Sequence, residues 1–210
     1  MTTPSLTLYT HPQSRGRITR WMIEEVGQPY EVVSLTLGGS MKAPEFLAIN
    51  PMGKVPALRH GTVIVTEVAA ICAYIADAFP EAGLAPPPTS PLRGPYYRWL
   101  FFAAGPLEAA MSNKALGFEV PAAREVMIGY GRIETALEAL EGAISAAKPF
   151  LLGEQFSAAD VYVGSHLLFG MQFGTIEKRA AFVAYAERLA ARPAYKRANE
   201  LDDAMMAAKS

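Results

Sequence analysis

The chain has 210 residues, of which 51% are hydrophobic and 19% are charged, so it can bury the core of one or two domains. This composition excludes intrinsic disorder. Lys and Arg number 19 against 20 Asp and Glu, and this balance, with a net charge of -1, argues against nucleic acid as a partner.

Cysteine content and hydrophobic runs indicate the compartment. The single cysteine, Cys72, excludes an intrachain disulfide and any metal site built from several cysteines. Residues Met1 to Ser5 lack the basic segment and apolar core of a secretory signal, and no run approaches the roughly 18 apolar residues of a membrane span. We therefore expect a cytoplasmic protein that does not enter a membrane.

A change of composition between Pro80 and Pro91 divides the sequence. This stretch contains five prolines and has no apolar periodicity, which is typical of a linker between domains. We predict an α/β domain over residues 1–80, a linker over residues 81–91 and an all-helical domain over residues 92–210.

The first domain alternates short β-like runs with helix-like ones. We predict, in order, a strand at Leu6–Thr10, a helix ending before Gly27, a strand at Tyr30–Leu35, a helical turn at Ala43–Ile49, a hairpin of Val55–Arg59 and Thr62–Thr66, and a helix at Glu67–Phe79. The first strand, helix and second strand form a βαβ unit with parallel strands. The domain is thus βαβ followed by ββα.

The second domain is rich in Ala, Leu, Glu and Arg, which favour helices. The predicted helices are Leu92–Leu116, Ala122–Ala147, Ala158–Phe173, Lys178–Ala191 and Ala194–Ala207. Ser157 and Asp160 have the spacing of a capping box, in which each side chain binds a free amide at the start of a helix.

A polar turn, His11–Arg17, joins the first strand to the first helix. In α/β domains, backbone amides and the helix dipole meet a ligand at this place. Ser14 within the turn is either a capping residue or a donor to a ligand, and taken alone the first interpretation is simpler. The sequence lacks a Gly-x-Ser-x-Gly motif, so a hydrolase nucleophile is not expected.

Two further segments of the first domain have the chemistry of a binding site. In Asn50–Leu58, Pro56 marks either a sheet edge or a cis peptide bond, and the main chain of Val55 could pair with a peptide laid alongside as an extra strand. Glu67 stands at a predicted helix start. It either complements the helix dipole or binds a ligand ammonium group.

Three other reactive residue types have plain structural interpretations. Cys72 lies on the apolar face of its helix, which predicts a buried, inert thiol. His60 and His166 are interpreted as a turn residue and a helix residue, because neither has a second ligand at metal-binding spacing. We predict no metal site.

Taken in order along the chain, these motifs resemble the soluble glutathione S-transferases over essentially the whole sequence. Asn50–Leu58 is similar to the glutathione-site segment of that family, and Gly153–Asp160 is similar to its helical-domain folding signature. The resemblance implies a thioredoxin-like domain that holds glutathione, an all-helical domain that contributes the electrophile pocket, and a homodimer.

The resemblance also implies roles for individual residues. Val55 would bind the cysteinyl backbone of glutathione through its main chain, with Pro56 as the cis proline, and Glu67 would face the γ-glutamyl ammonium group. The family usually has Ser or Thr after this acid, whereas this chain has Val68, which offers an amide but no hydroxyl. Gln13 and Lys42 are further candidate contacts with glutathione.

The resemblance does not give a single position for the residue that activates the glutathione thiol. Different classes of the family would put it at Gln13, Ser14 or Arg15, and of these only Ser14 has a hydroxyl. We therefore expect Ser14 to stabilise the thiolate. The candidate electrophile-pocket residues, which are equally consistent with ordinary core, are Tyr9, His11, Phe102, Leu107 and Met111.

The predicted function is the conjugation of glutathione to small hydrophobic electrophiles, as in detoxification. The alternative is a noncatalytic binding or regulatory protein of the same fold, and a thiol-disulfide oxidoreductase is disfavoured because the first helix start has no cysteine. The apolar positions of Glu67–Phe79 and the aromatic run Tyr96–Phe102 predict a homodimer, unless they fill the interface between the domains of one chain.

Overall fold

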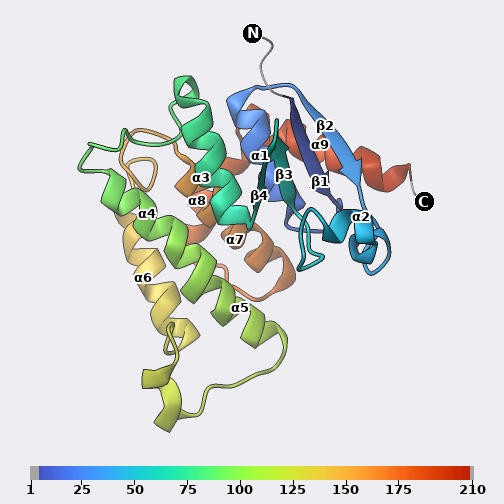
Figure 1. Ribbon diagram of the computed structural model, residues 1–210. Helices are drawn as coiled ribbons and strands as arrows, with labels where there is room; N and C mark the ends of the chain where they lie inside the picture. The colour runs from blue at the N-terminus through green and yellow to red at the C-terminus, as the bar shows by residue number, and fades with distance from the viewer. Residues whose placement is uncertain (1–4, 209–210) are drawn as a thin grey trace. The chain divides into compact units, whose positions relative to one another are not determined.

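The computed structural model describes residues 5–208 (Figure 1). Residues 1–4, which are part of the segment considered above for a secretory signal, and residues 209–210 lie outside the described residues. The chain forms two compact units. The first unit comprises the residues up to Ala82 together with those from Ala191 onward, and the helical unit comprises Gly83–Ala190.

The first unit is built on a four-stranded mixed sheet in the order β2-β1-β3-β4. Its strands are β1 (Leu6–Thr10), β2 (Tyr30–Ser34), β3 (Ala57–His60) and β4 (Val63–Thr66). β1 pairs in parallel with β2 and antiparallel with β3, and β3 pairs antiparallel with β4. Every residue of β1 is buried, as expected for a central strand. The predicted βαβ unit and the hairpin are confirmed.

Helical segments follow strands β1, β2 and β4. Helix α1 (Gly16–Val26) ends at Gly27, whose φ of 68° terminates the helix in the left-handed conformation. A 3₁₀ turn (Ser40–Lys42) and α2 (Pro44–Leu47) follow β2, and α3 (Val68–Ala78) follows β4. Helices α1 and α3 pack against each other. This βαβ-ββα order is the predicted thioredoxin-like arrangement.

The last helix of the chain, α9 (Pro193–Ala207), packs along α1 in the first unit. Residues 194–207 are predicted as part of the helical domain, because a helix-forming composition does not show what the helix packs against. Trp21 of α1 meets Tyr195 of α9 edge to face, with ring centroids 4.9 Å apart. The compact units thus differ from the predicted division at the C-terminal end of the chain.

The first helices of the helical unit form one continuous segment that is interrupted by a π-helical turn. Helix α4 (Arg93–Phe102) continues through a π-helical turn (Ala103–Leu107) into α5 (Glu108–Ala115). Pro106 lies in the π turn, where its missing N–H removes one helical hydrogen bond. The predicted single helix Leu92–Leu116 is therefore divided in three.

The next predicted helix, Ala122–Ala147, is wrong in its first part. Residues Ala122–Met127 form a 3₁₀ helix, and α6 (Ile133–Ala146) begins only after a loop. Gly131 in this loop has a φ of 61°, which a continuous right-handed helix does not allow. One continuous helix is predicted from the sequence because the many helix-forming residues are given more weight than Gly129 and Gly131, which break the helix.

Helices α7 (Ala158–Phe173) and α8 (Ala180–Ala190) complete the helical unit and agree with the prediction within two residues. The capping box at the start of α7 is confirmed. Oδ2 of Asp160 accepts hydrogen bonds from the backbone N–H and the hydroxyl of Ser157, at 2.9 and 2.8 Å. Within the described part of the chain, no helix has the length and apolar character needed to cross a membrane.

Candidate glutathione site

The strand register brings the predicted site segments of the first unit to one end of the sheet. Tyr9 of β1 stands opposite Ala57 of β3, and Ala57 stands opposite Thr66 of β4. The turn that follows β1, the residues that precede β3 and the residues that follow β4 therefore share that end. Ser14, Pro56 and Glu67 belong to these three segments.

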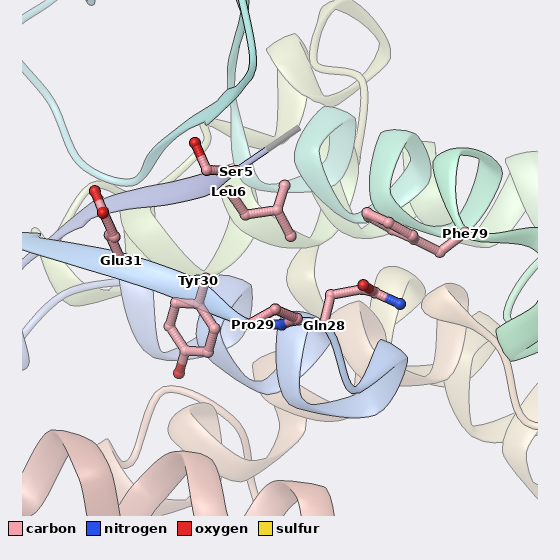
Figure 2. A pocket seen from close by; sticks show the side chains of 7 residues that line it. All are labelled: Ser5, Leu6, Gln28, Pro29, Tyr30, Glu31 and Phe79. Carbon is pink, nitrogen blue, oxygen red and sulfur yellow. The ribbon is translucent and has the colours of Figure 1, made fainter. Parts of the chain in front are cut away.

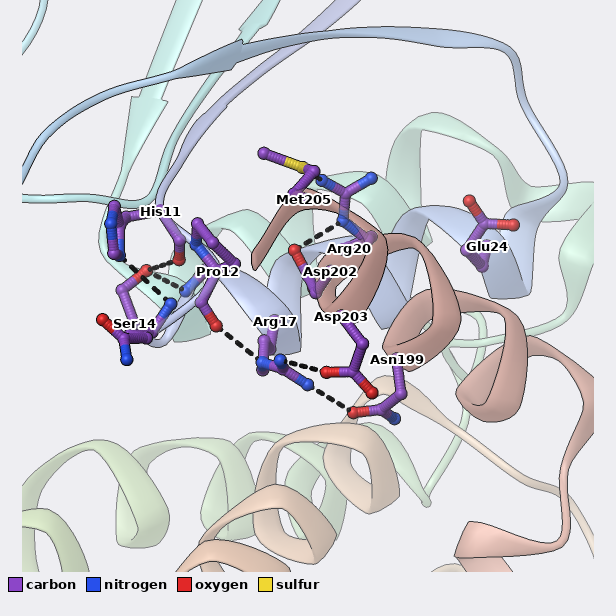
Figure 3. Close-up of polar contacts among 12 residues, drawn as sticks. His11, Pro12, Ser14, Arg17, Arg20, Glu24, Asn199, Asp202, Asp203 and Met205 are labelled. Atoms are coloured by element: carbon purple, nitrogen blue, oxygen red, sulfur yellow. Dashed lines mark hydrogen bonds and ion pairs between the residues drawn. The ribbon is translucent and has the colours of Figure 1, made fainter. Parts of the chain in front are cut away.

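The turn after β1 is held by the Ser14 hydroxyl (Figure 3). This hydroxyl donates to the carbonyl of His11 at 2.6 Å and accepts from the N–H of Gly16 at 3.0 Å. Nδ1 of His11 accepts from the N–H of Gln13 at 3.1 Å. Ser14 thus closes the turn just before α1, whose N-cap residue is Arg15, and its hydroxyl must turn away from His11 before it can donate to a ligand.

Gly16 allows the start of α1 to approach β1 closely. A Cβ at this position would lie 1.8 Å from Oγ1 of Thr10, which is far inside van der Waals contact. Any larger residue would therefore push the helix start, and with it Ser14, away from the sheet end.

The segment before β3 is fixed by Asn50, which is 3% exposed. Its Oδ1 accepts from the N–H of Met52 at 3.1 Å, and its Nδ2 donates to the carbonyl of Lys54 at 2.8 Å. Gly53 between them has a φ of 57°, and a Cβ there would come within 2.8 Å of the Met41 carbonyl. A side chain on residue 53 is thus excluded by both conformation and space.

This rigid turn leads into Val55 and Pro56. The peptide bond between them is cis, one of the two interpretations of Pro56. Val55 is half-buried, and among residues 5–208 we find no backbone partner for its N–H or carbonyl. Lys42 is exposed, and its Nζ donates to the carbonyl of Met52 at 3.1 Å.

Glu67 has a strained backbone directly before α3. Its φ of 66° and ψ of 121° make it the one non-glycine residue with a positive φ in the described chain. Such a conformation costs about 1–3 kcal/mol and is found mostly at functional sites. The side chain is exposed, and no partner for its carboxylate is found within residues 5–208. The Val68 side chain, by contrast, is only 8% exposed and packs in the core.

Comparison with known proteins agrees with this geometry. Residues 4–77 match the N-terminal domain of glutathione S-transferases, and residues 102–193 match the C-terminal domain. The chain belongs to the glutathione S-transferase family.

Individual members of the family align over most of the chain. Glutathione S-transferase 3 of Zea mays is 28% identical over 208 residues, which are 91% of this chain and 92% of that protein. A glutathione transferase structure from Methylococcus capsulatus is 30% identical, with a TM-score of 0.79 over 94% of this chain and 98% of that one. A sphingomonad glutathione S-transferase, solved in complex with glutathione, is 29% identical, with a TM-score of 0.76 over 94% and 98% of the two chains.

Cys72, His60 and His166 have contacts that are typical of structural residues. Cys72 is fully buried, and burial raises the pKa of its thiol to about 12, so it is not a nucleophile at neutral pH. His60 is the last residue of β3 and not a turn residue, because it still pairs with Leu6 of β1, and its ring hydrogen-bonds the Tyr74 hydroxyl at 3.0 Å. His166 lies in α7 as predicted and contacts Glu108 and the Tyr162 carbonyl, both at 2.9 Å. Among residues 5–208, no group of three potential ligands could hold a metal ion.

The candidate electrophile-pocket residues fall into two groups. Tyr9 and Leu107 are buried in the cores of their own units, and Tyr9 packs against Phe46 with ring centroids 5.8 Å apart. His11 in the first unit, and Phe102 and Met111 in the helical unit, are half-buried. These three retain surface that a ligand could contact.

A small cavity of the first unit lies away from the Ser14 turn. Figure 2 shows it between the starts of β1 and β2 and the end of α3. It has a volume of about 280 Å³ and is lined by Ser5, Leu6, Gln28, Pro29, Tyr30, Glu31 and Phe79. Because β1 and β2 are parallel, their starts face away from the sheet end that carries Ser14, and the cavity is separate from the candidate site.

Three residues that support the site have no role predicted from the sequence. Asn50, Gly53 and Gly16 hold the two site loops without being expected to contact glutathione. The Asn-Pro-x-Gly order was a readable turn signal for the first two. Gly16 gives no such signal, because the need for it comes from the close approach of Thr10.

Proposed function

We propose that this protein transfers the sulfur of glutathione to small hydrophobic electrophiles, as a detoxifying enzyme of the cytoplasm. The observation that carries the proposal is the meeting of the Ser14 turn, the Val55 main chain and Glu67 at one end of the sheet. Family membership supports glutathione transferase activity, and the sphingomonad relative was solved with glutathione.

In this proposal glutathione lies along the sheet end as an extended peptide. The main chain of Val55, which lacks a backbone partner within residues 5–208, pairs with the cysteinyl residue of glutathione. Glu67 binds the γ-glutamyl ammonium group, and the Val68 amide at the start of α3 is available to the γ-glutamyl carboxylate. Gln13 and Lys42, both exposed, supply further polar contacts.

The protein has to favour the thiolate over the thiol. A thiol with an ordinary pKa of about 8.5 is only a few per cent ionised at neutral pH. A hydroxyl donor and the start of a helix beside the sulfur lower that pKa, and a decrease of about 2 requires about 2.7 kcal/mol. The thiolate then attacks the electrophilic carbon. A new C–S bond forms, and either a leaving group departs or the adduct takes up a proton.

Replacing Ser14 with alanine tests this assignment. We expect turnover to fall by about tenfold or more while glutathione affinity changes less, because the hydroxyl acts chiefly on the thiolate. The thiolate absorbance of the complex, followed in the ultraviolet against pH, should show a raised pKa of the bound thiol. A chloronitrobenzene electrophile supplies the turnover assay.

Gln13→Ala is the comparison variant, because Gln13 adjoins Ser14, has an exposed side chain and is the other candidate donor to the thiol. If Gln13→Ala and not Ser14→Ala raises the thiol pKa, Gln13 is the donor. If neither does, Ser14 has only a structural role and backbone amides or an arginine activate the thiol. Wild-type protein that is retained on immobilised glutathione but shows no turnover would be a binding protein and not an enzyme.

We also propose that the protein is a homodimer. The apolar face of α3 is buried within the chain, since Ile71, Cys72 and Ile75 are all 0% exposed. On α4, by contrast, Tyr97 and Phe101 are 40% and 68% exposed, and their ring centroids lie 6.2 Å apart. Two exposed aromatic side chains on one helix face favour contact with a second copy.

Light scattering at micromolar concentration tests the dimer. We expect a mass of about twice the 22.6 kDa of one chain, and Phe101→Glu should reduce it toward one chain because the charge would be buried at the interface. Phe173→Glu is the control, since Phe173 is 74% exposed at the end of α7. A wild-type mass of one chain at all concentrations would contradict the proposal.

A further inference from the structure

Helix α9 is joined to α1 by arginine contacts along the length of both helices. Near the end of α1, Arg192 donates from Nε and Nη2 to the two carboxylate oxygens of Glu25, at 2.6 and 2.7 Å. In the middle, Nε of Arg20 donates to Asp202 at 3.0 Å, and both side chains are almost fully buried. Nη2 of Arg20 also donates to Sδ of Met205 at 2.9 Å, so the second half of α9 packs against the middle of α1.

At the start of α1, Arg17 completes this series and also reaches the site turn (Figure 3). Its Nη1 donates to Oδ1 of Asn199 at 3.0 Å, and its Nη2 donates to Oδ1 of Asp203 at 2.5 Å. Its Nε donates to the carbonyl of Pro12 at 2.6 Å. One guanidinium thus connects α9 to the turn that carries Ser14.

This connection depends on the shape of the arginine side chain. A planar guanidinium offers five N–H donors in a fixed arrangement, and Arg17 directs Nε and both Nη atoms to different acceptors. The bonds that the Ser14 hydroxyl makes, to His11 and Gly16, are local to the turn and to the helix start. The Arg17 bond to Pro12 links the turn to a helix that lies about 190 residues later in the chain.

We propose that Arg17 is a positioning residue for the glutathione site, which uses the docked helix α9 as its support and holds the Ser14 turn in the orientation that activates the thiol. This inference rests on the proposed function. It makes the C-terminal helix part of the glutathione site, although no residue of α9 was expected to act there.

The three ion pairs between α1 and the α9 segment differ in burial, and this difference indicates which of them stabilises the docking of α9. The Arg20 and Asp202 side chains are 3% and 0% exposed, and the Glu25 side chain is 5% exposed. The Asp203 side chain is 68% exposed. Exposed ion pairs contribute little to stability. Loss of the Arg17–Asp203 contact should therefore leave α9 docked while it loosens the turn.

The experiment compares four variants of the full chain. Arg17→Gln removes the link, Arg17→Lys keeps the charge but not the arrangement of donors, and the double variant Asn199→Ala/Asp203→Asn removes the support on α9. Arg192→Gln loosens the other end of α9 and is the matched control. For each variant we would measure kcat, KM for glutathione, the pKa of the bound thiol, the melting temperature, and amide hydrogen exchange of residues 11–16.

We expect Arg17→Gln to lower kcat by about tenfold or more and to raise the pKa of the bound thiol, because small displacements of a reacting group are costly. The double variant should show the same change to a smaller extent, and Arg17→Lys should lie between Arg17→Gln and wild type. Arg192→Gln should lower the melting temperature without changing the thiol pKa or the exchange of residues 11–16.

Two results would overturn the proposal. One is that Arg17→Gln leaves kcat, thiol pKa and exchange unchanged. The other is that Arg192→Gln changes them as much as Arg17→Gln does at an equal loss of melting temperature, which would make Arg17 an ordinary docking contact. If the wild-type protein has no transferase activity, the proposed function fails, and the exchange of residues 11–16 in these variants still decides whether Arg17 positions the turn.

Discussion

Replacing Asp160 with alanine is expected to lower the free energy of unfolding by about 3–5 kcal/mol, because it leaves several buried donors without an acceptor. Asp160 is 0% exposed. Besides the two bonds from Ser157, its Oδ1 accepts from the N–H of Leu151 at 2.8 Å and from the Tyr185 hydroxyl at 2.6 Å. The carboxylate therefore joins the start of α7 to α8 and to the loop after α6.

The electrostatics of this carboxylate explain why a partial replacement is also costly. Burial raises the pKa of Asp160, and the hydrogen bonds from Tyr185, Leu151 and Ser157 act in the opposite direction. If the donors are removed, the buried carboxylate loses the hydrogen bonds that offset its burial. If the carboxylate is removed, the buried donors are left without an acceptor. Asp160→Asn keeps the size but turns one acceptor into a donor, and should lie between alanine and wild type.

Thermal and urea unfolding, followed by circular dichroism, measure the effect. For a chain of this length the loss corresponds to a decrease of about 10 °C in melting temperature. Glu134→Ala is the matched control, because Glu134 lies in the first turn of α6 but is exposed, and its interaction with the helix dipole contributes at most about 1 kcal/mol. Equal stability of Asp160→Ala and Glu134→Ala would show that the capping box does not support the helical unit.

The elements predicted with least error are those whose ends have local signals. Gly27 ends α1 in the left-handed conformation, and Ser157 with Asp160 starts α7 at the predicted residue. Two short β-like runs separated by His60 and Gly61 predicted the hairpin of β3 and β4. These signals act over a few residues and are therefore readable without the fold.

The errors arose where the outcome depends on packing. The residues of α9 were correctly predicted to be helical, but their place beside α1 depends on partners such as Arg20 and Asp202, which are 182 residues apart. The π turn at Ala103–Leu107 and the late start of α6 at Ile133 likewise follow from how proline and glycine are accommodated in the helical unit.

For the site, sequence reasoning located the segments better than the chemistry of each side chain. The register of β1, β3 and β4 brings the turn of Ser14, the Val55–Pro56 step and Glu67 to one end of the sheet. It was not predictable that the Ser14 hydroxyl would donate to His11, or that Arg17 would bind Pro12, because both depend on the exact path of the turn.

The backbone of Glu67 adds a physical reason for its predicted role. A positive φ is unfavourable for a residue with a Cβ, and a glycine would adopt it without that cost. The residue nevertheless carries a carboxylate that is exposed and lacks a partner within residues 5–208. A strained conformation that directs an unpaired charge outward, directly before α3, is consistent with a side chain whose partner is a ligand.

We therefore expect Glu67→Gln to weaken glutathione binding by about 1.5–3 kcal/mol, the range for a hydrogen bond to a charged group, which is a roughly 10- to 150-fold increase in Kd. Calorimetric titration with glutathione measures it. Glu31→Gln is the control, because Glu31 is also an exposed glutamate but lies near the start of β2, away from the Ser14 end of the sheet. The Glu67 variant should keep the wild-type melting temperature, since the backbone and side-chain size are unchanged. Equal affinity of the Glu67 and Glu31 variants would remove the carboxylate from the site and leave the strain at residue 67 to be explained by the α3 start alone.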